Sequence, residues 1–260
     1  MAHIVAVVNQ KGGVGKTTTA VNLSAGLAAA GQRVLCVDFD PQGNATSGFG
    51  IPKHPKMSTI YHVLAGKAAP HDLLWRLIPN HLDLLPANAE LGGAEVELAQ
   101  EAEREYWLRG SLLEAVQEYD TVLIDCPPSL GLLTVNALVV ANSVLIPLQC
   151  EFYALEGLTQ LLRTIDITRE QLNPDLKLSG ILLTMFDMNN RLNVQVAHDV
   201  RRHMPDRLLK TTIPRNHLVA EAPSFGKPVL WYDIDCPGSH AFLSLAQEWI
   251  ELNKTFYDEV

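Results

Sequence analysis

The chain has 260 residues, of which 47% are hydrophobic and 19% charged, and its 20 basic and 29 acidic residues give a formal net charge of −9. This length and apolar content suit a globular protein and exclude the disordered and low-complexity classes. The acidic balance argues against a protein that binds nucleic acid or an anionic membrane over its whole surface.

Short apolar runs rich in β-branched residues alternate with longer stretches of helical period. Strands are predicted at residues 4–9, 33–39, 121–126, 143–148 and 178–184, and helices at 17–30, 132–141, 155–171 and 194–203. Because the strands are apolar on both faces, we expect an α/β fold with a mostly parallel, twisted sheet and helices on both of its faces. The less regular residues 52–109 are expected to form a helical excursion between two strands.

Residues 11–17 read KGGVGKT, follow an apolar strand and open a helix, which is the setting of a phosphate-binding loop. The glycines allow a tight turn whose N–H groups point inward, and the helix adds its positive end. Lys16 can reach the β- and γ-phosphates of a nucleotide, and Thr17 can ligate Mg²⁺. The residues predicted to bind nucleotide here are Lys11, Gly12, Gly13, Val14, Gly15, Lys16, Thr17 and Thr18. Residues 1–260 are therefore predicted to form a single P-loop NTPase domain.

The loop departs from the ordinary pattern G-x-x-x-x-G-K-[ST] at one position. Gln10 stands where the first glycine would be, and Lys11 adds a second lysine at the start of the loop. This combination is the deviant form of the Walker A motif. A lysine at this position cannot easily turn back toward phosphates held by its own loop.

Carboxylates follow two of the predicted strands. Asp125 ends one strand and suits the Walker B role of holding Mg²⁺ through water. Asp38 and Asp40 lie at the end of another strand, where strand alternation would turn both to the same face. One of these two is expected to order Mg²⁺ or the attacking water.

Six segments, in order along nearly the whole chain, carry a resemblance to one family. They are NQKGGVGKTTTA at 9–20, VDFDPQGNAT at 37–46, DCPPS at 125–129, EFYALEG at 151–157, IPRN at 213–216 and AEAPSFGKP at 220–228. On these segments the chain resembles the ParA/Soj partition ATPases, within the deviant Walker A group that includes MinD and the nitrogenase iron protein.

The resemblance implies a role for each site residue. The implied catalytic residues are Lys11, Lys16 and Asp40, with Lys11 crossing to the other protomer and Asp40 positioning the hydrolytic water. The implied metal site is formed by Thr17, Asp40 and Asp125. Met185, Pro214 and Arg215 resemble the part that frames the adenine. The implied cofactors are ATP and Mg²⁺.

The family resemblance also implies a function. ATP would close a sandwich homodimer with weak ATPase activity, and this dimer would bind DNA without sequence preference. A ParB/Spo0J-type centromere-binding partner would stimulate hydrolysis and so drive chromosome or plasmid partitioning. The protein is expected in the cytoplasm, and on the nucleoid when ATP is bound. The alternative is a related ATPase that positions a non-DNA cargo such as a chemotaxis assembly, and a metal-cluster carrier is a third reading.

Three features separate this chain from other relatives. Its four cysteines show no zinc or disulfide spacing and are expected to be buried free thiols, which leaves Cys126 as a small strand residue rather than a cluster ligand. The amphipathic tail at 241–260 has Lys254 as its single base, so we expect it to dock on its own domain and not on a membrane. Ten residues precede Lys11, so no DNA-reading domain is expected before the loop.

Residues 191–227 contain seven basic and three acidic residues, a net charge of +4 that leaves −13 for the remainder. Such a window can supply local positive potential for phosphate, although charged clusters are commonly solvated helix faces. The tentative DNA contacts are Arg201, Arg202, Lys210, Arg215 and Lys227. Leu218 stands where family members often have arginine, so DNA affinity could be weaker, dependent on pH through His217, or carried by the other bases.

Overall fold

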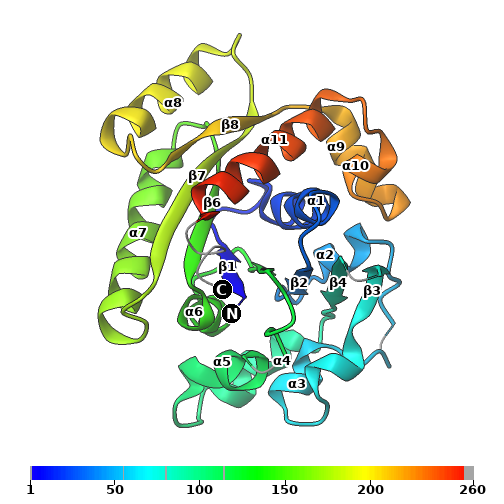
Figure 1. The fold of residues 1–260 in the computed structure, drawn as a ribbon. Coiled ribbons are helices and arrows are strands. Elements are labelled where there is room, and N and C mark those ends of the chain that lie inside the picture. Colours follow the sequence, from blue (N-terminus) through cyan, green and yellow to red (C-terminus); the bar gives the residue numbers. More distant parts are fainter. Residues whose placement is uncertain (1, 55, 80, 114, 255–260) are drawn as a thin grey trace.

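The computed structural model describes residues 2–54, 56–79, 81–113 and 115–254 (Figure 1). Within them the sheet has eight strands in the order β3-β4-β2-β5-β1-β6-β7-β8. Their bounds are β1 His3–Val7, β2 Val34–Asp38, β3 Trp75–Ile78, β4 Leu82–Leu85, β5 Thr121–Asp125, β6 Ser143–Gln149, β7 Lys177–Phe186 and β8 Leu208–Pro214. All neighbours pair in parallel except β3 and β4. The predicted mostly parallel α/β sheet is confirmed.

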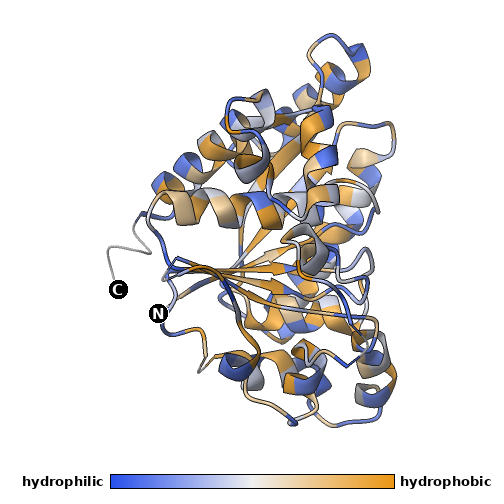
Figure 2. Cartoon of the chain, turned by 90° about the vertical axis from the view of Figure 1, so that its right-hand side faces the viewer, coloured by the Kyte–Doolittle hydropathy of each residue, from blue (hydrophilic) through white to orange (hydrophobic). Residues whose placement is uncertain are grey.

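Helices cover both faces of this sheet. The α-helices are α1 Lys16–Ala29, α2 Asn44–Gly48, α3 Ile60–Leu64, α4 Leu91–Leu98, α5 Trp107–Leu112, α6 Leu132–Val140, α7 Ala154–Gln171, α8 Arg191–His203, α9 His217–Glu221, α10 Val229–Tyr232 and α11 Pro237–Leu252. Short 3₁₀ helices are η1 Pro70–Leu73, η2 Arg104–Tyr106 and η3 Ala222–Phe225. Figure 2 shows the hydrophobic strands nearly edge-on between the two helical layers.

Alternation along the strands divides the apolar core in two. In β1, Ile4 and Ala6 face the core shared with α3 to α8, whereas Val5 and Val7 face the core shared with α1, α2, α10 and α11. Every residue of β1, β2 and β5 is buried, which is typical of central parallel strands. The carboxyl ends of these three strands therefore meet at one rigid edge.

Two parts of the sheet differ from the sequence prediction. Residues 52–109 include β3 and β4 as well as helices, so the prediction of a helical excursion is incomplete. The prediction also missed β8, which is partly exposed along its length. Both β3 and β8 lie at the edges of the sheet, where one side of a strand lacks the apolar residues that identify central strands. The edge at β8 is partly covered, because the Glu248 carboxylate accepts hydrogen bonds from the backbone N–H groups of Lys210 and Thr211.

The C-terminal helix α11 packs on α1 and β8 (Figure 1). Phe242 and Trp249 are buried in this contact, and Gly26 allows a close approach, since a β-carbon there would lie 3.0 Å from Cβ of Ala246. The expectation that this helix docks on its own domain is confirmed for the described residues, and Phe256 of the predicted tail lies outside them. Among the helices of the described chain, none combines the length and apolarity needed to cross a bilayer. The four cysteines are buried and free, as predicted.

Candidate nucleotide-binding site

The phosphate loop joins the carboxyl end of β1 to the first residue of α1, Lys16. Gly13 and Gly15 have φ angles of 76° and 90°, a backbone region that glycine enters without strain. The Asn9 side chain accepts from Lys11 N at 2.9 Å and donates to the carbonyl of Pro147 at 2.7 Å. Together these features fix the loop on the sheet before any ligand binds.

The opposite side of the loop is tied to β7. The hydroxyl of Thr184 donates to the carbonyl oxygen of Val14 at 2.7 Å. A β-carbon on Gly15 would lie 3.7 Å from a methyl group of this threonine. The loop is thus held by β6 through Asn9 and by β7 through Thr184, a partner that the sequence analysis did not identify.

Lys16 is 7% exposed, and its Nζ donates to the carbonyl oxygen of Lys11 at 3.1 Å. Burial lowers the pKa of this ammonium group, whereas the nearby Asp125, Cys126 and Asp40 raise it. The side chain therefore folds back over its own loop, where phosphate oxygens would replace a single backbone carbonyl as its partner.

Asp125 is fully buried at the end of β5, and neither of its carboxylate oxygens makes a hydrogen bond of ordinary geometry within the described residues, although the Thr17 side chain lies close enough to lower its pKa. Burial, followed by the charge of Asp38, raises the pKa of Asp125 well above its usual range, whereas Thr17 and Lys16 lower it. A buried carboxylate with so little hydrogen bonding is costly unless a cation or a bound water satisfies it. The donor set beside Thr17 therefore fits Mg²⁺, which uses one or two protein oxygens and fills its shell with water and phosphate.

The structure separates Asp38 from Asp40. Asp38 is fully buried, and its Oδ2 accepts from Thr46 N at 2.7 Å and from Thr46 Oγ1 at 2.6 Å. The same hydroxyl accepts from Ala87 N at 3.0 Å, which links the carboxylate to the segment after β4. Burial raises the pKa of Asp38 to about 6, against the hydrogen bonds from Thr46 and Asp40 that lower it. Asp38 therefore has a structural role, because its hydrogen bonds with Thr46 connect the end of β2 to α2 and to the segment after β4.

Asp40 lies two residues beyond the end of β2, so strand alternation does not set its direction, contrary to the expectation from sequence. Its Oδ1 accepts from Gln42 N at 2.9 Å, and its carbonyl accepts from Gly43 N at 2.8 Å. Asp40 therefore belongs to a tight turn, with one carboxylate oxygen not used by that turn. Of the two carboxylates, Asp40 is the one available to a ligand or a water.

Lys11 forms an ion pair with Glu151, which follows β6. The two side chains are 40% and 46% exposed, so the pair lies at the surface of the loop. The Lys11 ammonium group is thus paired with a carboxylate outside its own loop.

A cavity of about 380 Å³ opens beside the phosphate loop. It brings together Met185, Pro214 and Arg215, the three residues predicted to frame a base, with Thr18 of α1. Met185 has a φ of 50°, an uncommon backbone region for a residue with a side chain and one that often marks functional sites. The sequence analysis missed the other lining residues, namely Thr19, Thr184, Ile213, Asn216, His217, Val219, Ala220 and Phe242.

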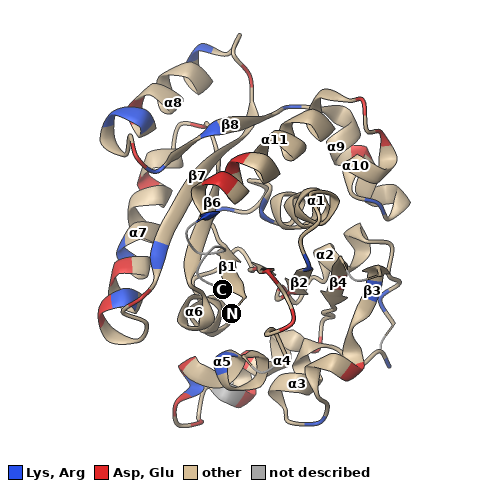
Figure 3. Cartoon of the chain, in the orientation of Figure 1, with Lys and Arg blue, Asp and Glu red and all other residues tan. Residues whose placement is uncertain are grey.

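The residues predicted to contact DNA are exposed but do not lie in one place. Arg201 and Arg202 are in the last turn of α8, and Lys210 is on the edge strand β8. Lys227 precedes α10, which lies on the other side of α11 from α8 (Figure 3). Leu218 is partly buried against the core under α1 and α11. The basic window of residues 191–227 is thus divided between two regions of the surface.

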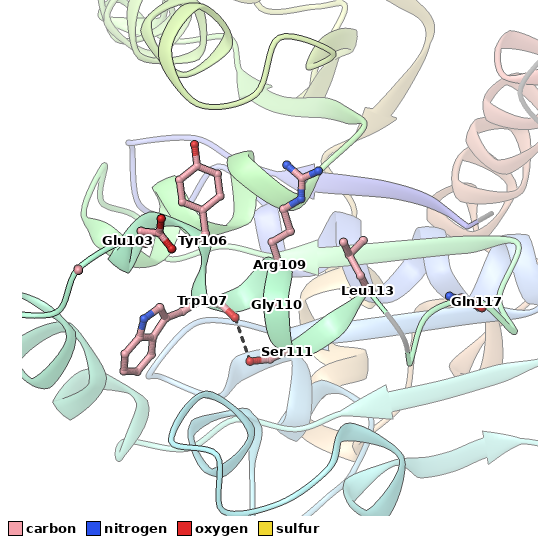
Figure 4. A pocket seen from close by; sticks show the side chains of 9 residues that line it. Glu103, Tyr106, Trp107, Arg109, Gly110, Ser111, Leu113 and Gln117 are labelled. Atoms are coloured by element: carbon pink, nitrogen blue, oxygen red, sulfur yellow. Dashed lines mark hydrogen bonds between the residues drawn. The ribbon is translucent and has the colours of Figure 1, made fainter.

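A wider concavity of about 930 Å³ lies over η2 and α5 and contains none of the predicted site residues. Figure 4 shows Tyr106, Arg109 and Leu113 pointing to one side of this segment and Trp107 to the other. The candidate pocket for a nucleotide base is therefore the smaller cavity, which borders Gly15 of the phosphate loop and Thr18 of α1.

A mostly parallel sheet with a phosphate loop after β1 and a buried acid at the end of β5 is typical of a P-loop ATPase. Residues 2–178 match the model of a family described as an AAA domain. The chain is 55% identical over 250 residues to the chromosome partitioning protein ParA of Caulobacter vibrioides (strain NA1000 / CB15N), covering 95% of this chain and 94% of that one. The chain belongs to the ParA/Soj family of chromosome-partitioning ATPases.

Two further comparisons agree with this assignment. The chain is 48% identical over 248 residues to the chromosome-partitioning ATPase Soj of Treponema pallidum (strain Nichols), covering 95% and 97% of the two chains. Its fold matches a crystal structure described as cobyrinic acid a,c-diamide synthase from Mycobacterium smegmatis with bound ATP analog and magnesium, with a TM-score of 0.85 and 38% identity over 98% and 97% of the chains. A structural relative thus holds nucleotide and magnesium in this fold.

Proposed function

We propose that this protein is a Mg²⁺-dependent ATP switch that dimerises around ATP, hydrolyses it slowly and partitions chromosome or plasmid DNA. The observation that carries the proposal is the fully buried Asp125 carboxylate beside Thr17 and Lys16, whose oxygens make no hydrogen bond of ordinary geometry within the described residues. The single sheet shared by the described residues supports residues 1–260 acting as one ATPase domain. ATP and Mg²⁺ are the proposed cofactors, supported by the relative that contains an ATP analog and magnesium.

Each proposed role follows from a position in the site. The amides of residues 12–18 would hold the phosphates, Lys16 would neutralise charge on the β- and γ-phosphates, and the cavity with Met185 and Pro214 would hold the base. Thr17 and Asp125 would hold Mg²⁺, which supplies neutralisation of charge on the phosphates when bound. The free carboxylate oxygen of Asp40 would orient the attacking water, directly or through the metal shell.

Lys11 is proposed to act in a dimer. Its exposed pair with Glu151 places its ammonium group outside its own loop, where the nucleotide of a second protomer could reach it. An ion pair this exposed contributes little stability, so exchange of the carboxylate for a phosphate is energetically accessible. The proposed dimer would therefore place two nucleotides at its interface, with Lys11 of each protomer on the other's phosphates.

Non-specific DNA binding by the ATP dimer is proposed for the exposed bases of α8 and β8 and for Arg215, with Lys227 as a separate contact. A ParB/Spo0J-type protein is the proposed stimulating partner, and the cytoplasm, with the nucleoid in the ATP state, is the proposed location. The names of the ParA and Soj relatives support these assignments. The proposed alternative is a non-DNA cargo, which is favoured by the partly buried Leu218 and the divided basic residues.

The decisive experiment measures binding of a random-sequence DNA duplex with ATP, ADP or no nucleotide at several salt concentrations. Partition function predicts binding with ATP alone, with an affinity that falls linearly with salt on logarithmic axes. The matched control is Arg201→Ala with Arg202→Ala, which should lower both the affinity and the slope. Absence of ATP-dependent binding at about 50 mM salt would contradict the DNA proposal and favour the alternative cargo.

A further inference from the structure

Helix α4 lies beside two loops of the site, the loop that contains Asp40 and the loop that follows Asp125. Strands β2 and β5 are neighbours, and their register places Asp38 opposite Asp125. The loops that follow, residues 39–43 and 126–131, leave the sheet at this shared edge. Helix α4 is fixed on the core by Leu91 and Ala94, which are buried. The helix is therefore anchored independently of either loop.

The first turn of α4 lies next to the loop that contains Asp40. A β-carbon added at Gly92 would lie 3.7 Å from Cβ of Pro41, the residue after Asp40. Just before the helix, the carbonyl oxygen of Ala87 would lie 2.7 Å from a β-carbon on Gly43. Gly43 thus lets the Asp40 loop approach the Ala87 carbonyl closely, whereas a β-carbon at Gly92 would be in ordinary van der Waals contact with Pro41.

The next turn of α4 contacts the loop that follows Asp125. The Glu95 carboxylate accepts from Leu133 N at 3.4 Å, at the N-terminus of α6. A β-carbon on Gly131 would lie 2.6 Å from the same oxygen, so this position requires glycine while Glu95 stays in place. A carboxylate also interacts favourably with the positive end of α6. Glu95 therefore holds the end of the loop 126–131.

Gly92 and Glu95 are three positions apart, so they share one face of α4. Gly93 and Glu97 lie on a different face of the helix. The nearest atom to a β-carbon added at Gly93 would be a Glu97 oxygen, at 4.0 Å. The Glu97 carboxylate accepts from the hydroxyl of Tyr61. Neither Gly92 nor Glu95 lines the cavity beside the phosphate loop. The face of α4 that carries Gly92 and Glu95 lies next to loops 39–43 and 126–131 and does not line the cavity proposed for the nucleotide base.

We propose that α4 couples the Asp40 loop to the Asp125 loop, with Gly92 and Glu95 as positioning residues for ATP hydrolysis. The proposal rests on the proposed function, because it assumes that Asp40 and Asp125 serve the hydrolytic site. A rigid helix in contact with both loops makes their positions interdependent, so that a shift of one loop changes the alignment of the other. Small misalignments at a hydrolytic site lower kcat much more than they affect nucleotide binding.

The test uses matched pairs of substitutions on the two faces of α4. Gly92→Val pushes methyl groups toward Pro41, whereas Gly93→Val imposes the same change in helix propensity without that contact. Glu95→Gln weakens the hold on α6, whereas Glu97→Gln is its control. We expect Gly92→Val and Glu95→Gln to lower kcat about tenfold with KM for ATP within about twofold of wild type. Both controls should keep wild-type kcat, and all four variants should unfold at similar temperatures.

Coupling is measured in the Gly92→Val, Glu95→Gln double variant. If α4 joins the two loops, its loss in kcat is clearly smaller than the product of the single losses. Unchanged kcat in both single variants, or strictly multiplicative losses, would overturn the proposal. Hydrogen exchange gives a second readout: Mg·ATP should slow exchange of residues 91–98 in wild type but not in Gly92→Val. An inactive wild type would contradict the proposed ATPase function, and the exchange experiment would still decide the coupling.

Discussion

Replacing Thr46 by valine tests the structural role assigned to Asp38. The substitution keeps the shape of the side chain and removes the hydroxyl that donates to Asp38 Oδ2 at 2.6 Å and accepts from Ala87 N at 3.0 Å. Loss of a buried hydrogen bond to a carboxylate costs about 1.5–3 kcal/mol, and the unpaired N–H of Ala87 costs roughly 1–3 kcal/mol. We expect the free energy of unfolding to fall by about 3–5 kcal/mol at pH 8.

The expected loss depends on pH. Burial raises the pKa of Asp38 to about 6, and the hydrogen bonds from Thr46 oppose that rise. An acid whose pKa is raised on folding costs stability as the pH rises through that value, because the folded state must then hold a buried charge. Without the hydroxyl this cost grows, so the effect of Thr46→Val should be larger at pH 8 than at pH 5.

Urea unfolding followed by circular dichroism at the two pH values measures both effects. The control is Ser47→Ala, which removes a hydroxyl that donates to the Gly43 carbonyl at 3.2 Å in the same helix. This control should change the free energy of unfolding by about 0.5 kcal/mol or less. A loss below about 1 kcal/mol in Thr46→Val, or an equal loss at both pH values, would refute the assignment of Asp38 as a buried anchor.

Three further substitutions test the proposed nucleotide site. Asp125→Asn should unfold at a higher urea concentration than nucleotide-free wild type at pH 7.5, because burial raises the pKa of Asp125. This gain in stability should vanish near pH 4. Mg·ATP should no longer stabilise the variant. Lys11→Ala should still bind ATP but not dimerise with a slowly hydrolysed analogue, and an undiminished dimer by light scattering would contradict the role of Lys11. Asp40→Ala should form ATP-bound dimers that persist, and wild-type turnover in phosphate release would remove Asp40 from water activation.

The sequence alone was sufficient for β1, β2, β5, β6 and β7 and for the phosphate loop, but not for the interior strand β4. Strand β1, the loop and α1 are contiguous, and their apolar run, glycines and helical period are local features that one segment of sequence displays. The edge strands β3 and β8 escaped prediction because their half-exposed residues lack the doubly apolar pattern. The parallel pairing of the central strands could be predicted because these strands are apolar on both faces. The pairing at the edges of the sheet depended on neighbours distant in sequence.

The tertiary structure decided which of the acidic residues has a structural role and which is available to a ligand. The sequence shows Asp38, Asp40 and Asp125 at or near strand ends. It cannot show that Thr46 hydrogen-bonds to Asp38, or that the oxygens of Asp125 make no hydrogen bond of ordinary geometry within the described residues. The pair of Lys11 with Glu151 joins residues at the ends of two different strands. Local sequence determines backbone conformation and motif chemistry, but hydrogen-bond partners and burial are set by the packing of distant segments, and these fix which carboxylate is free to act.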